Sequence, residues 1–299
     1  MRRIEATLLI LVLLVCVPAL AHAQTTWHVD DDCAPPGSGA EVDPFCTIQM
    51  GVDAASDGDA VLVAPGTYTG DGNRDISLFG RIITLRSTEG PDATTIDIEG
   101  GPTAIHRGFF LIHGESNETV IEGFTIKNGY LIGDTGGTGP AGGGGGAAIY
   151  IRDSSPTIRN CIVRNNVSET LGAPFLVDGR GGGIYVDGSS HAVIENCIIK
   201  HNTSEKRGGA IYVGYSQSAV TVRNCLFINN QGGGATFYNT FAASSVVNTG
   251  IVDNIDAIGF ISENSSVILT IESCIEKEAT YGPNWILSPA ARTKERRRD

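Results

Sequence analysis

The residues from 181 to 230 hold two near-copies of one sequence unit, and this repetition constrains the fold more than any other feature. Each copy opens with a Gly-rich segment ending in Ile-Tyr-Val, at Gly181–Val186 and Gly208–Val213. After a Gly- or Ser-containing turn, each continues with Asn-Cys and an apolar segment. A less regular third copy begins at Gly146. Self-similarity at a period of roughly 20–50 residues indicates stacked supersecondary units, so the chain is expected to bury its core between neighbouring repeats.

The cysteines set the period of the repeat. The places assigned as equivalent along the chain are Gly123, Cys161, Cys197, Cys225, Gly250 and Cys274. The shortest interval between them is 24 residues, and the intervals before Cys161 and Cys197 are 38 and 36 residues. Short segments rich in Val, Ile, Thr and Tyr alternate with Gly, Ser and Asn, as strands alternate with turns. A short unit holding three such strands is one coil of a parallel β-helix, whose stability is a sum along the stack.

This pattern resembles the right-handed parallel β-helix family, the superfold of the pectate and pectin lyases. The elements Gly208–Ile211 and Phe227–Asn230 are also similar to repeats of chlamydial polymorphic outer-membrane proteins. The resemblance covers residues 27 to about 276. It implies an all-β, single-stranded right-handed parallel β-helix of about eight coils, with a short N-terminal capping α-helix. Superfolds host many activities, so the resemblance predicts the fold more strongly than the function.

The chain is expected to have four parts. Residues 1–23 read as a secretion signal, because two arginines precede an apolar run and Ala21-His22-Ala23 is a small-x-small cleavage site. The mature protein is then secreted, periplasmic or on the cell surface. Residues 24–59 form an N-terminal cap, 60–280 the β-helix, and 281–299 a disordered tail. No transmembrane segment is expected, because the apolar run is shorter than the roughly 20 residues that a span requires.

The cap contains a short amphipathic helix and a predicted disulfide. Thr47 is an N-cap, and Ile48, Val52 and Ala55 share one face that covers the open end of the β-helix. Export permits disulfides, and Cys33–Cys46 closes a short Pro/Gly loop. Four nearby carboxylates offer oxygen ligands of the kind that calcium takes, although without a known ligand spacing. These are Asp30, Asp31, Asp32 and Asp43. No other cofactor is expected.

Strand alternation assigns directions to the repeated side chains. The isoleucines and valines of Ile-Tyr-Val are expected to point inward, with the cysteines as buried, reduced thiols. The alternative for the cysteines is a disulfide between adjacent coils, Cys161–Cys197 or Cys197–Cys225. The tyrosines point outward and are interpreted either as an aromatic strip that stacks on sugars or as a stabilising stack. These are Tyr150, Tyr185 and Tyr212. One turn position is predicted to carry a hydrogen-bonded ladder of Asn128, Asn166, Asn202 and Asn230.

The two long intervals place insertions at residues 129–145 and 167–180. Consecutive coils set equivalent turns side by side, so the insertions are expected to wall a groove, where loops on a rigid scaffold often carry function. They are alternatively tolerated insertions without a role. The side chains predicted to bind a ligand there are Tyr130, Asp134, Glu169, Phe175, Asp178 and Arg180.

Between residues 24 and 290 there are 14 basic and 30 acidic residues, a net charge of −16 that argues against nucleic acid as a partner. The resemblance implies that an enzyme of this fold carries acidic residues on adjacent coils with Arg, Lys or His nearby, but the regular coils contain no Asp-Asp pair. The nearest catalytic candidates are His113, Glu115 and Arg107. The first hypothesis is a monomeric β-helix protein that binds polysaccharide or another cell-surface partner, without strong catalysis. The alternatives are a polysaccharide lyase, hydrolase or epimerase, and a structural or adhesin-like spacer.

Overall fold

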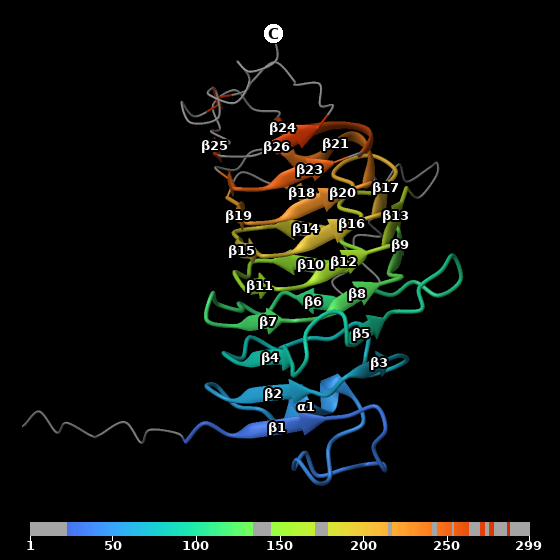
Figure 1. Cartoon of the computed structure of the whole chain (residues 1–299), viewed down its shortest axis with the longest axis vertical. Coiled ribbons are helices and arrows are strands. Elements are labelled where there is room, and N and C mark those ends of the chain that lie inside the picture. Colours follow the sequence, from blue (N-terminus) through green and yellow to red (C-terminus); the bar gives the residue numbers. More distant parts are fainter. Residues whose placement is uncertain are drawn as a thin grey trace, which may run out of the picture.

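The computed structural model describes residues 23–133, 145–170, 179–214, 217–240, 244–252, 254–262, 270–272, 275–277 and 286–287. In these residues three parallel sheets run along an elongated stack, with one helix at its N-terminal end (Figure 1). Most consecutive strands enter different sheets, except that β1 and β2 share the first sheet and β9/β10, β13/β14 and β17/β18 share the third. Each strand pairs with strands of the neighbouring coils. The predicted all-β parallel β-helix with a capping helix is confirmed.

The bounds of the strands follow the three sheets. The first sheet contains β1 (Thr26–Val29), β2 (Ala60–Val63), β4 (Thr84–Ser87), β7 (Val120–Glu122), β11 (Thr157–Arg159), β15 (His191–Glu195), β19 (Ala219–Arg223), β22 (Ser245–Val247), β25 (Thr270–Glu272) and β27 (Ile286–Leu287). The second contains β3 (Gly66–Tyr68), β5 (Thr94–Asp97), β8 (Thr125–Lys127), β12 (Ile162–Arg164), β16 (Ile198–Lys200), β20 (Leu226–Ile228), β23 (Gly250–Val252) and β26 (Ile275–Lys277). The third contains β6 (Phe109–Leu111), β9 (Tyr130–Ile132), β10 (Ile149–Arg152), β13 (Val167–Glu169), β14 (Ile184–Asp187), β17 (Thr203–Ser204), β18 (Ile211–Val213), β21 (Gln231–Asn239) and β24 (Ile255–Ser262).

The N-terminal end of the stack is closed by α1 (Ile48–Ala54), which lies beside β1 and β2 (Figure 1). The Thr47 hydroxyl accepts a hydrogen bond from the Met50 N–H, as an N-cap should, and Ile48 and Val52 are fully buried. The Cys33–Cys46 disulfide is present. β1, which was not predicted, precedes the helix and pairs with β2, so the first sheet begins inside the segment assigned to the cap.

The core is a column of aliphatic side chains from the three sheets. Ile149, Ile184 and Ile211 pair in register and are fully buried, as predicted. Burying each such side chain contributes about 1.5–3 kcal/mol, repeated from coil to coil. Residues 76–79 form no strand, and Ile76 makes only an isolated bridge to Phe109.

At the corner between the first and second sheets, the positions predicted to be equivalent to the cysteines are wrong by one residue at Gly123 and Gly250. Cys225 N donates to the Thr249 hydroxyl, so Thr249 takes the cysteine place, while Gly250 pairs with Leu226. Gly123 likewise precedes the place of Cys161 and aligns with the left-handed Asn160. The cysteines of this corner are free and buried, as predicted: Cys161, Cys197 and Cys225. Cys274 lies outside the described residues.

The corner between the second and third sheets carries the asparagine ladder. Asn166 Nδ2 donates to Asn202 Oδ1 at 2.8 Å, and Asn202 Nδ2 donates to Asn230 Oδ1 at 3.0 Å. The ladder continues to Asn254. Asn128 is not a member, because it occupies the preceding, left-handed position at φ 60°. The prediction is therefore right for three of the four residues.

The long intervals interrupt the third sheet rather than one of its corners. The strands before the insertions, β9 and β13, pair with each other, and so do β10 and β14 after them. In β21 the two halves are one continuous strand. The ends of the two insertions therefore lie side by side, as expected. The insertions' residues 134–144 and 171–178 lie outside the described residues.

Candidate functional site

The tyrosines of the third sheet point away from the aliphatic core but are not exposed. They form a second buried cluster, separate from the core, with exposed fractions of 5% or less. Its members are Phe110, Tyr150, Tyr185, Tyr212 and Tyr238. Neighbouring rings lie between 5.0 and 5.7 Å apart. Because a sugar can stack only on an accessible ring face, the expectation of an exposed aromatic strip is wrong.

Arginines pack over these rings. The Arg107 guanidinium lies 4.9 Å from the Tyr150 ring centroid, and Arg180 and Arg207 lie 5.3 and 5.0 Å from the rings of Tyr212 and Tyr238. Cation–π contacts of this kind gain strength when they are removed from water. Burial of the tyrosines themselves raises the pKa of the Tyr150 and Tyr185 hydroxyls. Arg107 and Arg180, predicted as site residues, thus pack over the aromatic cluster. The available sequence signal was an Arg-Gly pair shortly before Ile-Tyr-Val at Arg180 and Arg207, and before Phe-Phe-Leu at Arg107.

Two of the predicted loop residues contact each other. The Tyr130 hydroxyl donates to the Glu169 carboxylate across β9 and β13, and burial together with this carboxylate raises the pKa of Tyr130 to about 12. Both residues therefore lie in strands at the base of the insertions. Asp134, Phe175 and Asp178 lie outside the described residues, so the groove between the insertions stays a prediction.

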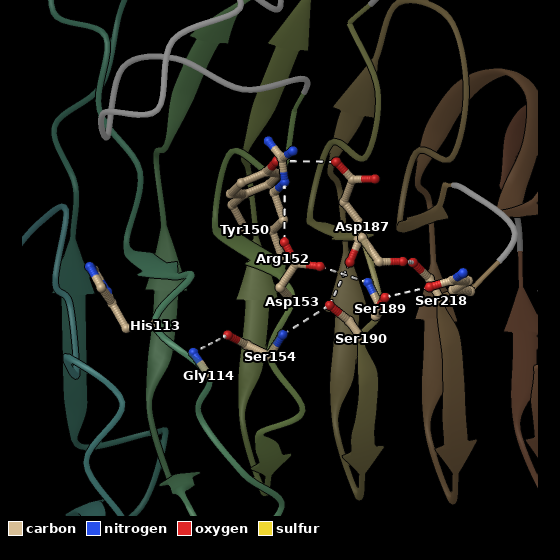
Figure 2. Close-up of polar contacts among 12 residues, drawn as sticks. His113, Gly114, Tyr150, Arg152, Asp153, Ser154, Asp187, Ser189, Ser190 and Ser218 are labelled. Carbon is tan, nitrogen blue, oxygen red and sulfur yellow. Dashed lines mark hydrogen bonds and ion pairs between the residues drawn. The ribbon is translucent and has the colours of Figure 1, made fainter.

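A different set of exposed side chains lines the turns that lead from the third sheet to the first. We call it the edge row, and its members are Phe79, His113, Arg152, Asp153, Ser189 and Gln217. They belong to successive coils, and two groups of them make contacts along the stack. The rings of Phe79 and His113 lie 5.5 Å apart. Ser189 N donates to Asp153 Oδ1 at 2.9 Å, and the Ser189 hydroxyl donates to Gln217 Oε1 at 2.7 Å. Figure 2 shows Arg152, Asp153 and Ser189 on neighbouring turns, where the edge row offers exposed hydrogen-bonding groups.

Buried polar side chains hold the same turns from the inside. The Ser154 hydroxyl donates to Glu115 Oε2 at 2.7 Å. In Figure 2 the Ser190 hydroxyl accepts from Ser154 N, at 3.2 Å. In the next coil the Ser218 hydroxyl donates to the Gly188 carbonyl at 2.7 Å. Because buried polar groups are costly without partners, these bonds fix the backbone that carries the edge row. The edge row is thus presented on a rigid base.

Asp187 gives the edge row its electrostatic character. Its Oδ2 accepts a hydrogen bond from the Tyr150 hydroxyl at 3.2 Å, whereas its buried Oδ1 has no hydrogen-bond partner among the described residues. Burial raises the pKa of the Asp187 carboxyl, and the nearby charge of Asp153 adds to the shift. Arg152 Nε lies 3.6 Å from Asp153 Oδ2, and both of these side chains are more than half exposed. A buried and an exposed carboxyl therefore flank one guanidinium.

The raised pKa of Asp187 predicts a pH-dependent stability. The folded protein holds this proton more tightly than the unfolded chain, so the carboxyl favours folding at low pH. That contribution is lost as the pH rises from the ordinary pKa of 3.8 through the raised folded value. Asp187→Asn cannot ionise, so its stability relative to wild type is expected to increase over this range. Urea unfolding at several pH values tests this, with the exposed Asp71→Asn as control; parallel profiles for both variants would contradict it.

The three catalytic candidates do not converge on one site. Arg107 is fully buried against the aromatic cluster, and Glu115 is 1% exposed. Glu115 accepts hydrogen bonds from the backbone N–H groups of Gly80 and His113 at 3.1 and 3.0 Å. His113 is exposed, and its Nδ1 lies 3.2 Å from the Ser77 hydroxyl. Only His113 therefore joins the exposed edge row, while Glu115 supports it from below.

The acidic residues of the cap lie at the opposite end of the stack from β27. One carboxylate oxygen from each of Asp30, Asp31 and Asp32 lies within 4.8 Å of the others, and Asp43 does not join this group. Two of these carboxylates already accept backbone hydrogen bonds, from Asp32 N and Thr67 N. Calcium binding at this group stays a prediction.

Comparison with known proteins agrees with this architecture. The family described as the right handed beta helix region matches residues 94–275, which is more than half of the chain. The chain therefore belongs to the right-handed β-helix family. No curated protein sequence matches the chain.

Several solved structures share the fold. A pectin methylesterase from carrot superposes with a TM-score of 0.51 at 10% identity, covering 90% of this chain and 89% of its own. The Escherichia coli protein YbhC gives a TM-score of 0.50 at 17% identity, covering 87% of this chain and 74% of its own. The pectate lyase Pel9A gives 0.49 at 14% identity, with coverages of 86% and 78%. At such low identity the likeness to the carrot and Escherichia coli proteins establishes the fold alone.

Within the described part of the chain, no helix has the length and apolarity needed to span a membrane.

Proposed function

We propose that the protein is exported and binds a polysaccharide along the edge row. The observation that carries this proposal is the row of exposed polar side chains on the turns of successive coils, linked from Asp153 to Ser189 and from Ser189 to Gln217. Coils repeat at about 4.8 Å, so a polymer with repeated hydroxyl groups can meet a donor or an acceptor at successive coils. The described structure offers Arg152, Asp153, Ser189 and Gln217 for this purpose. The predicted groove between the insertions remains a further part of the proposed binding surface.

Affinity gel electrophoresis of the mature chain, residues 24–299, tests this proposal. The gels contain a soluble glucan, a galactan, polygalacturonate or alginate, each with and without calcium. At least one polymer is expected to retard the wild type. The double variant Ser189→Ala/Gln217→Ala should bind that polymer about tenfold more weakly, because two exposed hydrogen-bonding groups are lost.

A matched control separates this effect from a general change of the surface. Arg86→Ala/Glu89→Ala removes two exposed polar side chains at the other end of a first-sheet strand, away from the edge row. It should bind like the wild type. Equal retardation of all three proteins would place the binding surface elsewhere, and no retardation by any polymer would reject the proposed function.

A second candidate function, a carbohydrate-active enzyme, is favoured by Asp187 and Asp153. A buried carboxyl with a raised pKa can donate a proton, whereas an exposed carboxylate can accept one, and such divided pairs perform acid–base chemistry on sugars. Arg152 lies beside both carboxyls and can bind a developing negative charge.

Product release distinguishes the two functions. The mature protein is incubated with the same polymers, and new unsaturated ends and new reducing ends are both measured. The enzyme hypothesis expects new ends with wild type and their loss in Asp187→Asn, with Asp71→Asn unaffected. Release that is unchanged in Asp187→Asn would remove Asp187 from the chemistry, and no release would leave the binding function.

A further inference from the structure

Phe79 combines two features that rarely occur together. Its side chain is 51% exposed, and among the described residues only Val42 is another exposed large apolar side chain. Its backbone lies in the left-handed region at φ 53°. Single exposed apolar residues are common, but a bulky aromatic residue at positive φ is a steric outlier. Most of the other left-handed non-glycine positions hold asparagine, at Asn160 and Asn196 for example, although Glu99, Asp153 and His201 also adopt this conformation.

The surroundings of Phe79 hold its ring in a defined place. The His113 ring lies 5.5 Å from it, tilted by 47°, and the Arg81 guanidinium lies 5.4 Å from its centroid. The next residue, Gly80, is also left-handed, and a Cβ there would lie 2.4 Å from the His113 carbonyl oxygen. Gly80 N donates to the buried Glu115 carboxylate at 3.1 Å. The turn is therefore fixed, and the Phe79 ring is half exposed in a single orientation.

The strained backbone conformation of Phe79 is not offset by packing of its side chain in the core, because that side chain is not buried. Strained backbone conformations persist at functional sites, where the surrounding structure imposes them. An exposed, immobilised aromatic face has high affinity for flat apolar surfaces. On a polysaccharide such a surface is the face of a pyranose ring that carries its C–H bonds, while the neighbouring His113 and Arg81 can bind the hydroxyl groups at the ring's edge.

We propose that Phe79, flanked by His113 and Arg81, is a sugar-binding subsite at the N-terminal end of the edge row. The pyranose ring of one unit stacks on Phe79, and the polymer continues over Arg152, Asp153 and Ser189. This inference rests on the proposed carbohydrate binding. It adds a stacking residue and specifies that the ligand must present a pyranose face, beyond the hydrogen-bonding groups of the edge row.

Phe79→Asn tests the subsite, because a structural and a functional role predict opposite results. Asparagine tolerates the left-handed conformation, so relief of strain should raise Tm by about 2–4 °C. Loss of the ring should weaken binding about tenfold. The soluble glucan and polygalacturonate serve as probes in the affinity gels, and Phe79→Trp, which keeps an aromatic face, should retain binding.

The outcomes separate the subsite from the proposed function. A more stable Phe79→Asn with weakened binding supports the subsite. A Phe79→Asn that binds both probes like the wild type, or that melts at a lower temperature, overturns the subsite and leaves polysaccharide binding standing. Wild-type protein that neither probe retards overturns the subsite as well, and failure across the full polymer panel rejects the function on which it rests.

Discussion

Replacing Asn202 with alanine is expected to lower the free energy of unfolding by about 2–4 kcal/mol, because it breaks the ladder at its centre. Asn202 is fully buried. Its Oδ1 accepts from Asn166 N and Nδ2 at 3.1 and 2.8 Å, and its Nδ2 donates to Val163 O at 3.0 Å and to Asn230 Oδ1. Alanine leaves the buried Asn166 N–H and the Val163 carbonyl without these partners. Urea unfolding followed by circular dichroism measures the loss.

The control for this variant is Asn117→Ala, at an exposed asparagine outside the ladder. It should change stability by no more than about 0.5 kcal/mol, as surface substitutions usually do. The ladder would be shown to contribute little if Asn202→Ala and Asn117→Ala unfolded at the same urea concentration. Since every coil packs only on its neighbours, a central break also tests whether the stack unfolds as one unit.

The ladder shows which part of the fold the sequence could predict. Repetition and strand alternation were sufficient for the parallel coils and the buried isoleucines, and the N-cap Thr47 with helically spaced apolar residues was sufficient for the capping helix. They were not sufficient for the corners, where paired residues such as Asn165-Asn166 fit two registers. The pairs His201-Asn202 and Asn128-Gly129 resolve the ambiguity. The first residue of each adopts the left-handed conformation, and Asn202 of the first pair supplies the side-chain amide of the ladder.

The tyrosines show a different limit of sequence reasoning. Alternation correctly directed Tyr185 and Tyr212 away from the aliphatic core, but it could not predict what covers them. Arg180 precedes Tyr185 by five residues, yet it packs over Tyr212 of the following coil. A contact between coils depends on how the turns align in space, and local pattern does not specify this. The edge row could not be predicted from the sequence either. Its alignment depends on how the turns stack, and its residues share no type that would mark them in the sequence.

Glu115→Ala is expected to be the most disruptive single change at the candidate site, lowering the free energy of unfolding by about 3 kcal/mol or more. Three donors lose their acceptor together: Gly80 N, His113 N and the Ser154 hydroxyl. The first two lie beside Phe79 and in His113, so binding of the polymer should weaken as well. Glu115→Gln keeps the shape of the side chain and should have an intermediate effect on both quantities.

Urea unfolding and affinity electrophoresis of these two variants decide between a structural and a catalytic role for Glu115. A positioning residue gives losses of stability and binding that increase together from Glu115→Gln to Glu115→Ala. A catalytic carboxyl gives a Glu115→Gln variant that is stable and binds normally but releases no product. The exposed Glu118→Ala, three residues away, is the control and should resemble the wild type. The burial of Glu115 and its three donors favour the first result, in which the edge row depends on a carboxylate that the ligand never contacts.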